Sequence, residues 1–425
     1  MYLFFVRAFN DIDHMTPVVW RMHTDNCSVT VYCINPEYDI ESDYRLNFLR
    51  KLGVKVDYIY KNFDKELGLF HQMIRFLFLS GFAVKRQLSS VDRSPSSASP
   101  HMSGQLFQKL GSQLYDLAKK RYYDINWAYK VIERSCAKVL CFDWVRPRQY
   151  IVDVLLRAAK EMSVPTLALP HGVFVYTSDL SKIGSSKERT FEKYNRYDYI
   201  IVQNELCREV IAASGVDKEK IAVLGSARYC EEWLGQNRKI LPRTITSNGR
   251  NAGQLRVVFM TTKTRYGIHT ERMLRSFDIL SKFTNIEVMI KPHTRTGSET
   301  YLYDNLPLPF AWDISSVELC EWADVVLVVG SSIIVEALTL DKPILYLKYL
   351  HENTTLYEEY GACWTIHDES ELHDALLSLQ AGKATLPYVH ENVYRFLTEV
   401  IYGGWNQRDI LRDYREFIVN CAMGQ

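Results

Sequence analysis

The chain has 425 residues, of which 47% are hydrophobic and 24% charged, values that are ordinary for a globular protein of two or three domains. Its formal net charge of +1 gives no bulk positive field that would favour nucleic acid as a partner. No apolar run reaches the roughly 18 residues of a membrane-spanning helix, and residues 1–14 lack the pattern of a signal peptide. The nine cysteines are scattered without a CxxC pair, which indicates reduced thiols in the cytoplasm and neither a disulfide framework nor a protein-bound metal.

In the first half of the chain, short β-branched runs alternate with helix-like segments. The alternation begins as strand, helix, strand, helix, strand, which predicts a parallel sheet with crossover helices. The predicted strands are 2–9, 28–34, 54–60, 138–144, 165–172, 197–204 and 220–225. Helices are expected near Asp13, around Leu46 to Leu52, and over 152–162.

Two segments between the third and fourth strands stand out by composition. Residues 67–86 are strongly apolar and end in Lys85 and Arg86, so they fit either a buried crossover helix or an interfacial helix that docks on the inner face of a membrane. Residues 89–101 are rich in Ser and Pro and are predicted to form a loop.

Residues 235–254 lack apolar periodicity and are predicted to be a linker. Strands and helices alternate again after it, with strands expected at 255–262, 286–293, 324–329, 343–347 and 363–366. The fold class is therefore α/β, with two Rossmann-like, doubly wound domains that face each other across a cleft. The predicted boundaries are 1–234 for the first domain, 255–390 for the second, and 391–425 for C-terminal helices that could pack back on the first.

Polar residues follow the predicted strands of the first domain. Ligands of doubly wound sheets bind beyond the carboxyl ends of the strands, so these positions are candidates for a site. Asp143 ends the strand 138–144, His171 follows the next strand, and Arg228 follows the strand 220–225. Each also has a structural interpretation: His171 as a turn residue, Asp143 as the partner of Arg146 or Arg148, and Arg228 as the partner of Glu231 or Glu232.

The strand ends of the second domain carry several cations. The set consists of Lys263, Lys291, His293 and Arg295. Such a set, close to two serines at a helix start, suits a ligand that bears phosphate. The chain has no GxGxxG and no GxxxxGK[ST] motif, which disfavours dinucleotide oxidoreduction and P-loop chemistry.

The stretch GSSIIVEAL, residues 330–338, interrupts two apolar runs with polar residues. Gly330 would let the chain turn away from a strand, and Ser331 or Ser332 would cap the following helix. Glu336 lies four residues after Ser332, about one helical turn, where it could accept hydrogen bonds from a ribose diol. The structural alternative is that Ser332 is only a cap and Glu336 only a carboxylate near a helix start.

Three motifs together resemble those of bacterial surface-polymer transferases with the GT-B fold. The closest resemblance is to CDP-glycerol glycerophosphotransferases and to the related capsule and O-antigen (Kdo-type) glycosyltransferases. The motifs are ALPHG with His171, IKPHTR with Lys291, His293 and Arg295, and GSSIIVEAL with Ser331, Ser332 and Glu336, in the order and spacing of that group. The resemblance implies an acceptor-side first domain and a second domain that binds a nucleotide-activated donor.

The resemblance leads us to expect transfer of a glycosyl or polyol-phosphate group from such a donor to a hydroxyl of a surface glycan, and it includes cytidine-based donors. His171 is the first candidate for the general base, and Asp143 is the second, as base or as nucleophile. The residues expected to bind the donor are Lys263, Lys291, His293, Arg295, Ser331, Ser332, Glu336 and Arg228. No cofactor is expected, because fixed cations can replace a metal.

Three alternatives stay open at this point. One is a retaining Kdo transferase that uses CMP-Kdo with Asp143 as its nucleophile. Another is a nucleotide-sugar 2-epimerase or hydrolase of the same architecture, which would act without an acceptor. The last is a non-catalytic glycan- or nucleotide-binding protein. A transferase of this kind would work in the cytoplasm, either free or peripheral to the inner face of the membrane, on a glycan or lipid-linked acceptor and without nucleic acid.

Overall fold

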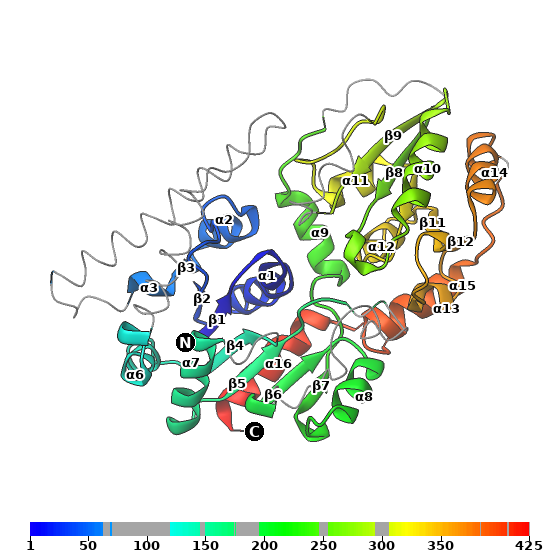
Figure 1. Cartoon of the computed structure of the whole chain (residues 1–425). Coiled ribbons are helices and arrows are strands. Elements are labelled where there is room, and N and C mark those ends of the chain that lie inside the picture. Colours follow the sequence, from blue (N-terminus) through cyan, green and yellow to red (C-terminus); the bar gives the residue numbers. More distant parts are fainter. Residues whose placement is uncertain are drawn as a thin grey trace. The chain divides into compact units, whose positions relative to one another are not determined.

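The structure is a computed structural model of the chain. It describes residues 1–62, 69, 120–144, 149–173, 175, 195–245, 254–293, 306–382, 384–405 and 408–424, with the side chains of Asn62 and Arg265 left out. These residues belong to two compact units, which are described separately (Figure 1). Unit 1 comprises Met1–His171, Thr190–Trp233 and Asp409–Gln425, and unit 2 comprises Gly172–Arg189 and Leu234–Arg408. The predicted loop 89–101 and, apart from Leu69, the apolar segment 67–86 lie outside the described residues.

Unit 1 is built on a parallel sheet of seven strands in the order β3-β2-β1-β4-β5-β6-β7. The strands are β1 Tyr2–Val6, β2 Val29–Cys33, β3 Lys55–Tyr58, β4 Val139–Asp143, β5 Thr166–Leu169, β6 Tyr199–Val202 and β7 Ile221–Val223. The chain runs outward from β1 to β3 on one side and then returns to β4 on the other side of β1. This reversal makes the gap between β1 and β4 the topological switch point of the sheet.

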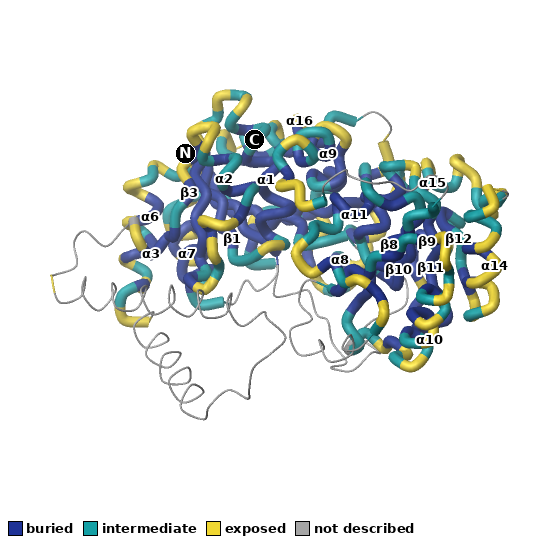
Figure 2. The backbone as a smooth tube through the Cα atoms, turned by 90° about the horizontal axis from the view of Figure 1, so that it is seen from above, coloured by how far each residue is buried: buried dark blue, intermediate teal, exposed yellow. Residues whose placement is uncertain are grey.

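The helices of unit 1 form two groups. They are α1 Phe9–Thr24, α2 Tyr44–Lys51, α3 Ile59–Asn62, α6 Ile125–Arg134, α7 Tyr150–Glu161, α8 Glu205–Ala213 and α16 Ile410–Met423, with α9 Glu231–Ile240 crossing into unit 2. Helix α1 packs against α2 and α16, whereas α6 packs against α7. Right-handed crossovers on the two sides of β1 place these groups on opposite faces of the sheet. Figure 2 shows that burial is greatest at the strands and at α1, and that exposed residues gather on the outer helices.

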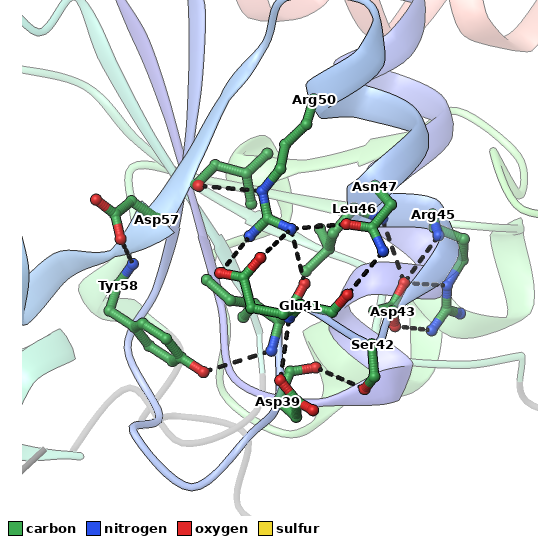
Figure 3. A network of polar contacts seen from close by, with 12 residues as sticks. Asp39, Glu41, Ser42, Asp43, Arg45, Leu46, Asn47, Arg50, Asp57 and Tyr58 are labelled. Atoms are coloured by element: carbon green, nitrogen blue, oxygen red, sulfur yellow. Dashed lines mark hydrogen bonds and ion pairs between the residues drawn. The ribbon is translucent and has the colours of Figure 1, made fainter. Parts of the chain in front are cut away.

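Side-chain caps fix where several helices begin. Asp43 accepts hydrogen bonds from the backbone N–H groups of Arg45 and Leu46 at the start of α2 (Figure 3). Asp124, Asn204 and Asp409 cap α6, α8 and α16 in the same way. Each cap satisfies a backbone donor that has no partner inside its helix, and it thereby sets the position of the first turn.

Unit 2 contains a five-stranded parallel sheet in the order β12-β11-β10-β8-β9. Its strands are β8 Leu255–Met260, β9 Ile286–Lys291, β10 Val325–Val328, β11 Ile344–Leu347 and β12 Trp364–Ile366. The helices are α10 Thr270–Ser281, α11 Ser316–Trp322, α12 Ile333–Leu338, α13 Leu356–Glu359, α14 Glu369–Gln380 and α15 His390–Phe396, which a π-helical turn, Leu397–Ile401, continues. Here the strand order reverses between β8 and β10, which is the switch point of unit 2.

The two parallel α/β units confirm the fold class predicted from the sequence. The differences lie at element ends. Residues 59–62 form α3 where the predicted strand 54–60 continued, and residues 235–240 of the predicted linker belong to α9. The C-terminal segment divides, because α15 belongs to unit 2 whereas α16 belongs to unit 1 and contacts α1. Within the described residues, no helix is long and apolar enough to cross a membrane.

Candidate functional site

The switch point of unit 1 carries a buried polar cluster. Arg7 is the first residue after β1, and Asp143 is the last residue of β4, the neighbouring strand. His171 follows β5 by two residues, and Asp11 lies in the first turn of α1. Parallel strands end at the same edge, so residues far apart in sequence meet there.

Hydrogen bonds connect all four side chains of this cluster. Asp143 accepts from the Arg7 guanidinium through Oδ1 and lies 2.6 Å from His171 Nδ1 through Oδ2. Asp11 accepts from the backbone N–H and from Nε of Arg7, both at 2.8 Å. On the other side of the imidazole, the amide of Asn10 lies 3.5 Å from His171 Nε2. The Nδ1–H tautomer of His171, with a lone pair on Nε2, satisfies all these contacts.

The charges in the cluster do not cancel. Two carboxylates face one guanidinium, so the group carries one excess negative charge while His171 is neutral. Burial, followed by the charge of Asp143, raises the pKa of Asp11 to about 6. Asp11 therefore keeps its proton to a higher pH than an ordinary aspartate does.

The two ends of the His171–Asp143 pair differ in access. The side chain of Asp143 is completely buried, whereas that of His171 is 31% exposed. Both carboxylate oxygens of Asp143 are engaged, one by Arg7 and the other by His171. A substrate can consequently approach the imidazole but not the carboxylate in this arrangement.

Asp11, Asp143 and His171 also have the spacing of a metal site, with one ligand atom from each lying within 4.8 Å of the others. Arg7, however, already places its guanidinium on both carboxylates. A metal ion would have to displace that guanidinium, so these residues fit a metal poorly. The sequence-based expectation that no metal is required stays a prediction.

A second ion-pair network lies beside the first and contains Arg228. Arg228 Nη1 lies 2.8 Å from Asp13 Oδ2, an ion pair that the sequence did not suggest. The buried Arg45 bridges Asp13 and Asp43 at 2.5 and 2.6 Å. Two guanidinium groups therefore balance two carboxylates. Arg228, whose side chain is 20% exposed, is anchored by this network at the edge of unit 1 and lies outside unit 2, where the donor site was expected.

His14, one turn after Asn10 on α1, is buried near both networks. Burial, followed by the charge of Arg228, lowers the pKa of His14 to about 3. It therefore stays neutral at physiological pH, unlike a histidine poised to titrate.

The switch point of unit 2 gathers part of the predicted donor site. Lys263 follows β8, and Ser331 and Ser332 follow the neighbouring strand β10; all three are half-buried. Ser331 Oγ accepts a weak hydrogen bond, 3.4 Å long, from the N–H of Ile333, whereas Ser332 makes no side-chain cap. The structure thus brings these three residues to one edge of the sheet.

Glu336 lies in α12 but is only 2% exposed. Its charge acts on Cys320 of α11, which places the carboxylate near that helix. In this arrangement Glu336 offers little surface to a ribose, and its predicted role stays a prediction.

Of the three basic residues of the motif IKPHTR, Lys291 and His293 do not share one environment in the structure. Lys291 is buried, and its Nζ donates to the carbonyl oxygens of Ala311 and Trp312 at 2.8 and 2.9 Å. Burial lowers the pKa of Lys291 to about 8. His293 is half-buried beyond β9, and Arg295 lies outside the described residues.

Arg7, Asp11 and Asn10 are the members of the unit 1 cluster to which the sequence assigned no role, although they follow its first predicted strand. Arg7 and Asp11 are spaced i, i+4 across the start of a helix, which is the one local signal of their pairing. The link from Arg7 to Asp143 spans 136 residues and depends on strand order. Sequence proximity had instead suggested Arg146 or Arg148, both of which lie outside the described residues.

Comparison with known proteins supplies a fold but no family. No protein-family model and no curated protein sequence matches the chain. Solved structures do match over nearly its whole length. UDP-GlcNAc 2-epimerase from Methanocaldococcus jannaschii is 13% identical, with 98% of this chain and 99% of that chain covered and a TM-score of 0.56.

Two further structures show the same likeness. UDP-GlcNAc 2-epimerase from Neisseria meningitidis, bound to UDP-GlcNAc, is 12% identical with both chains fully covered and a TM-score of 0.51. The glycosyltransferase of kitacinnamycin is 11% identical, with 99% of this chain and 97% of that chain covered and a TM-score of 0.50. At such identities the likeness establishes the fold, which is GT-B. One architecture thus carries both epimerases and transferases, and the choice between them depends on the site.

Proposed function

We propose that the chain is a glycosyltransferase or polyol-phosphate transferase that moves a group from a nucleotide-activated donor to a hydroxyl of a bacterial surface polysaccharide. The observation that supports this most directly is the His171–Asp143 pair at the switch point of unit 1. Its carboxylate is buried and its imidazole is accessible, which is the arrangement that a general base for a hydroxyl requires.

In the proposed reaction His171 is the base and Asp143 positions it. Nδ1–H donates to Asp143, so Nε2 keeps a lone pair that can take the proton of the acceptor hydroxyl when that hydroxyl replaces the 3.5 Å contact with Asn10. The hydroxyl oxygen forms a bond to the donor, at the sugar carbon or at the phosphorus of a polyol phosphate. The bond to the nucleotide breaks, and its electron pair leaves on the nucleotide phosphate. Asp143 then stabilises the imidazolium through the same hydrogen bond.

The alternative in which Asp143 is the nucleophile of a retaining Kdo transferase has less support. A carboxylate nucleophile must present an oxygen to the sugar carbon. Both oxygens of Asp143 face other protein groups, and its side chain has no exposed surface. An opening of the Arg7 contact would have to precede any such attack.

A nucleotide-sugar 2-epimerase or hydrolase is the second candidate function. The observation that favours it is the second buried carboxylate, Asp11, with a pKa raised to about 6 beside His171. Asp11 and His171, which lie side by side, could remove a proton from a sugar carbon and return one to it. This function would not require an acceptor, which separates it experimentally from transfer.

The finer assignments belong to the same proposal. The donor would be cytidine-based, as the resemblance to the CDP-glycerol and Kdo group implies, and its phosphates would lie near Lys263, Ser331 and Ser332. The acceptor would be a capsule or O-antigen glycan, free or lipid-linked. The chain would act in the cytoplasm, peripheral to the inner face of the membrane.

Nucleotide release measured with and without acceptor tests the proposal. CDP-glycerol, CMP-Kdo and UDP-GlcNAc would each be incubated with the protein, alone and with a surface glycan. Release that depends on added glycan supports transfer, whereas equal turnover without glycan supports the epimerase or hydrolase.

The matched variants for this assay are His171→Asn and His373→Asn, the latter at an exposed histidine of α14. Loss of the general base should lower turnover by about 10²- to 10⁴-fold in the first variant and leave the second unchanged. His171→Asn should still be stabilised by nucleotide in a thermal-shift panel of CMP, CDP, UDP and GDP. Undiminished turnover in His171→Asn would remove His171 from the chemistry.

A further inference from the structure

Lys291 and Trp312 are joined by a hydrogen bond at the edge of the unit 2 sheet. Residues 309–311 extend the sheet beyond β9: Ile290 donates to Pro309 O at 2.9 Å, and Ala311 donates back to Ile290 O at 2.8 Å. The bridge between Ile290 and Phe310 is parallel, so the added segment runs with the strands. Trp312 therefore follows at the carboxyl end of the sheet, which is the ligand-binding edge of such folds.

Trp312 is 44% exposed, whereas the neighbouring Phe310 is half-buried. Buried tryptophan contributes to a core, whereas a large exposed ring on a fixed backbone offers a flat apolar surface to a ligand. Phe310 lies behind it, with the ring centroids 6.3 Å apart. The ring thus contacts Phe310, and Trp312 as a whole keeps 44% of its surface exposed.

Lys291 holds the backbone beneath this ring. Its ammonium group, buried at the end of β9, donates to the carbonyls of Ala311 and Trp312. Two of its three donors are therefore used to fix the residue that carries the ring and the residue before it. A buried cation that is satisfied by backbone carbonyls is poorly placed to bind a phosphate as well.

The distance across the sheet suits a nucleotide. Met260, Lys291 and Val328 are aligned across β8, β9 and β10, and Trp312 lies just beyond that level. From β10, which leads into Ser331, three strand spacings of about 4.8 Å give roughly 14 Å to the segment before Trp312. That span is comparable with an extended nucleoside diphosphate. The edge thus offers hydroxyl and ammonium groups at one place and a flat ring at another, which matches the two ends of a nucleotide.

We infer that Trp312 is the stacking platform for the nucleobase of the donor and that Lys291 is a positioning residue that holds this platform. The inference rests on the proposed function, since it assigns the base-binding end of the same donor site. Stacking tolerates any base, so base identity would be selected elsewhere in the site.

Isothermal titration with CMP, UMP and GMP, and with ribose 5-phosphate as a probe without a base, tests the platform. Trp312→Ala should weaken binding of the three nucleotides by about 5- to 100-fold and leave ribose 5-phosphate unchanged. Trp312→Phe should recover part of the affinity. Trp405→Ala, at a residue of the same unit that is 67% exposed, is the matched control and should change nothing.

Lys291→Met separates positioning from direct phosphate binding. If Lys291 acts through Trp312, Lys291→Met should weaken nucleotides but not ribose 5-phosphate, and the double variant should lose little more than Trp312→Ala alone. Additive losses, or weaker binding of ribose 5-phosphate, would overturn the positioning role. If Lys291→Met does not fold, the same question is answered by Trp312→Ala and Trp312→Phe on the otherwise intact chain.

The outcomes distinguish this inference from the proposed function. If the wild type and Trp312→Ala bind nucleotides equally well, the platform is overturned and the transferase proposal stands. Wild-type protein that binds none of the nucleotides overturns both.

Discussion

Asp143→Asn is the substitution that tests the catalytic cluster most directly. The asparagine has the shape of Asp143 but only one oxygen, whereas the aspartate accepts from Arg7 and from His171 at once. If the amide oxygen faces Arg7, the amide N–H₂ faces His171 Nδ1 and forces the Nε2–H tautomer. If the oxygen faces His171, the N–H₂ opposes the guanidinium of Arg7, which leaves buried donors unsatisfied at a cost of about 1–3 kcal/mol.

The first orientation should prevail, because Arg7 carries a full charge and the imidazole can change tautomer without charge. His171 would then have a proton on the nitrogen that the proposed reaction requires as a base. The expected loss of turnover is about 10²- to 10⁴-fold, the range that general-base catalysis contributes. Stability should fall by no more than about 3 kcal/mol, because Arg7 keeps its bonds to Asp11.

The tautomer can be measured without knowing the substrate. Nitrogen-15 NMR of histidine-labelled protein, at about pH 8 where imidazole is neutral, distinguishes the two ring nitrogens. The chain has 11 histidines, and the signal that disappears in His171→Asn assigns the one of interest. We expect Nδ1–H in the wild type and Nε2–H in Asp143→Asn. An unchanged tautomer in the variant, or Nε2–H already in the wild type, would refute the reasoning.

Two further predictions concern stability. Arg45→Met should destabilise the protein by about 3–5 kcal/mol in urea unfolding, because it leaves Asp13 and Asp43 as buried carboxylates, whereas Arg412→Met at an exposed pair should cost less than about 0.5 kcal/mol. Asp11→Asn should gain stability relative to the wild type as pH rises from about 4 to 6. The folded pKa of Asp11, about 6, exceeds the unfolded value of about 3.9, so the favourable contribution of its protonated form is complete below pH 4 and is lost as pH passes 6, by up to about 3 kcal/mol. A wild type that instead gained stability over Asp11→Asn in that range would contradict the raised pKa.

The alternation of strands and helices was predictable because it depends on local periodicity. Buried parallel strands are short apolar runs, and each of those predicted in the described part of the chain is present. The helix at the end of the first unit, α9, was harder to predict from apolar periodicity. Helix α9 buries Trp233 and Asn237, and Leu241 directly after it continues the same spacing, but the polar Asn237 hides the periodicity in the sequence.

The partners of charged residues could not be predicted in the same way. The structural interpretation of the sequence paired Asp143 with Arg146 or Arg148, which lie outside the described residues, and Arg228 with Glu231 or Glu232, because these lie close in sequence. The structure pairs Asp143 with Arg7 and Arg228 with Asp13. These pairings follow from the position of β1 beside β4 and from the return of the chain after β7, and no short-range pattern encodes either.

Lys291 shows why cations at strand ends give an ambiguous signal. A lysine beyond a strand can reach a ligand, but it can equally turn back to satisfy carbonyls that would otherwise be buried without a donor. Lys291 does the latter, which leaves Lys263 and His293 as the half-buried members, within the described residues, of the set predicted to bind phosphate. With fewer cations on the phosphates, stacking on Trp312 would have to supply a larger part of the affinity for a nucleotide. Binding at this site should therefore depend less on ionic strength than it would if all the predicted cations contacted phosphate, because stacking is not screened by salt.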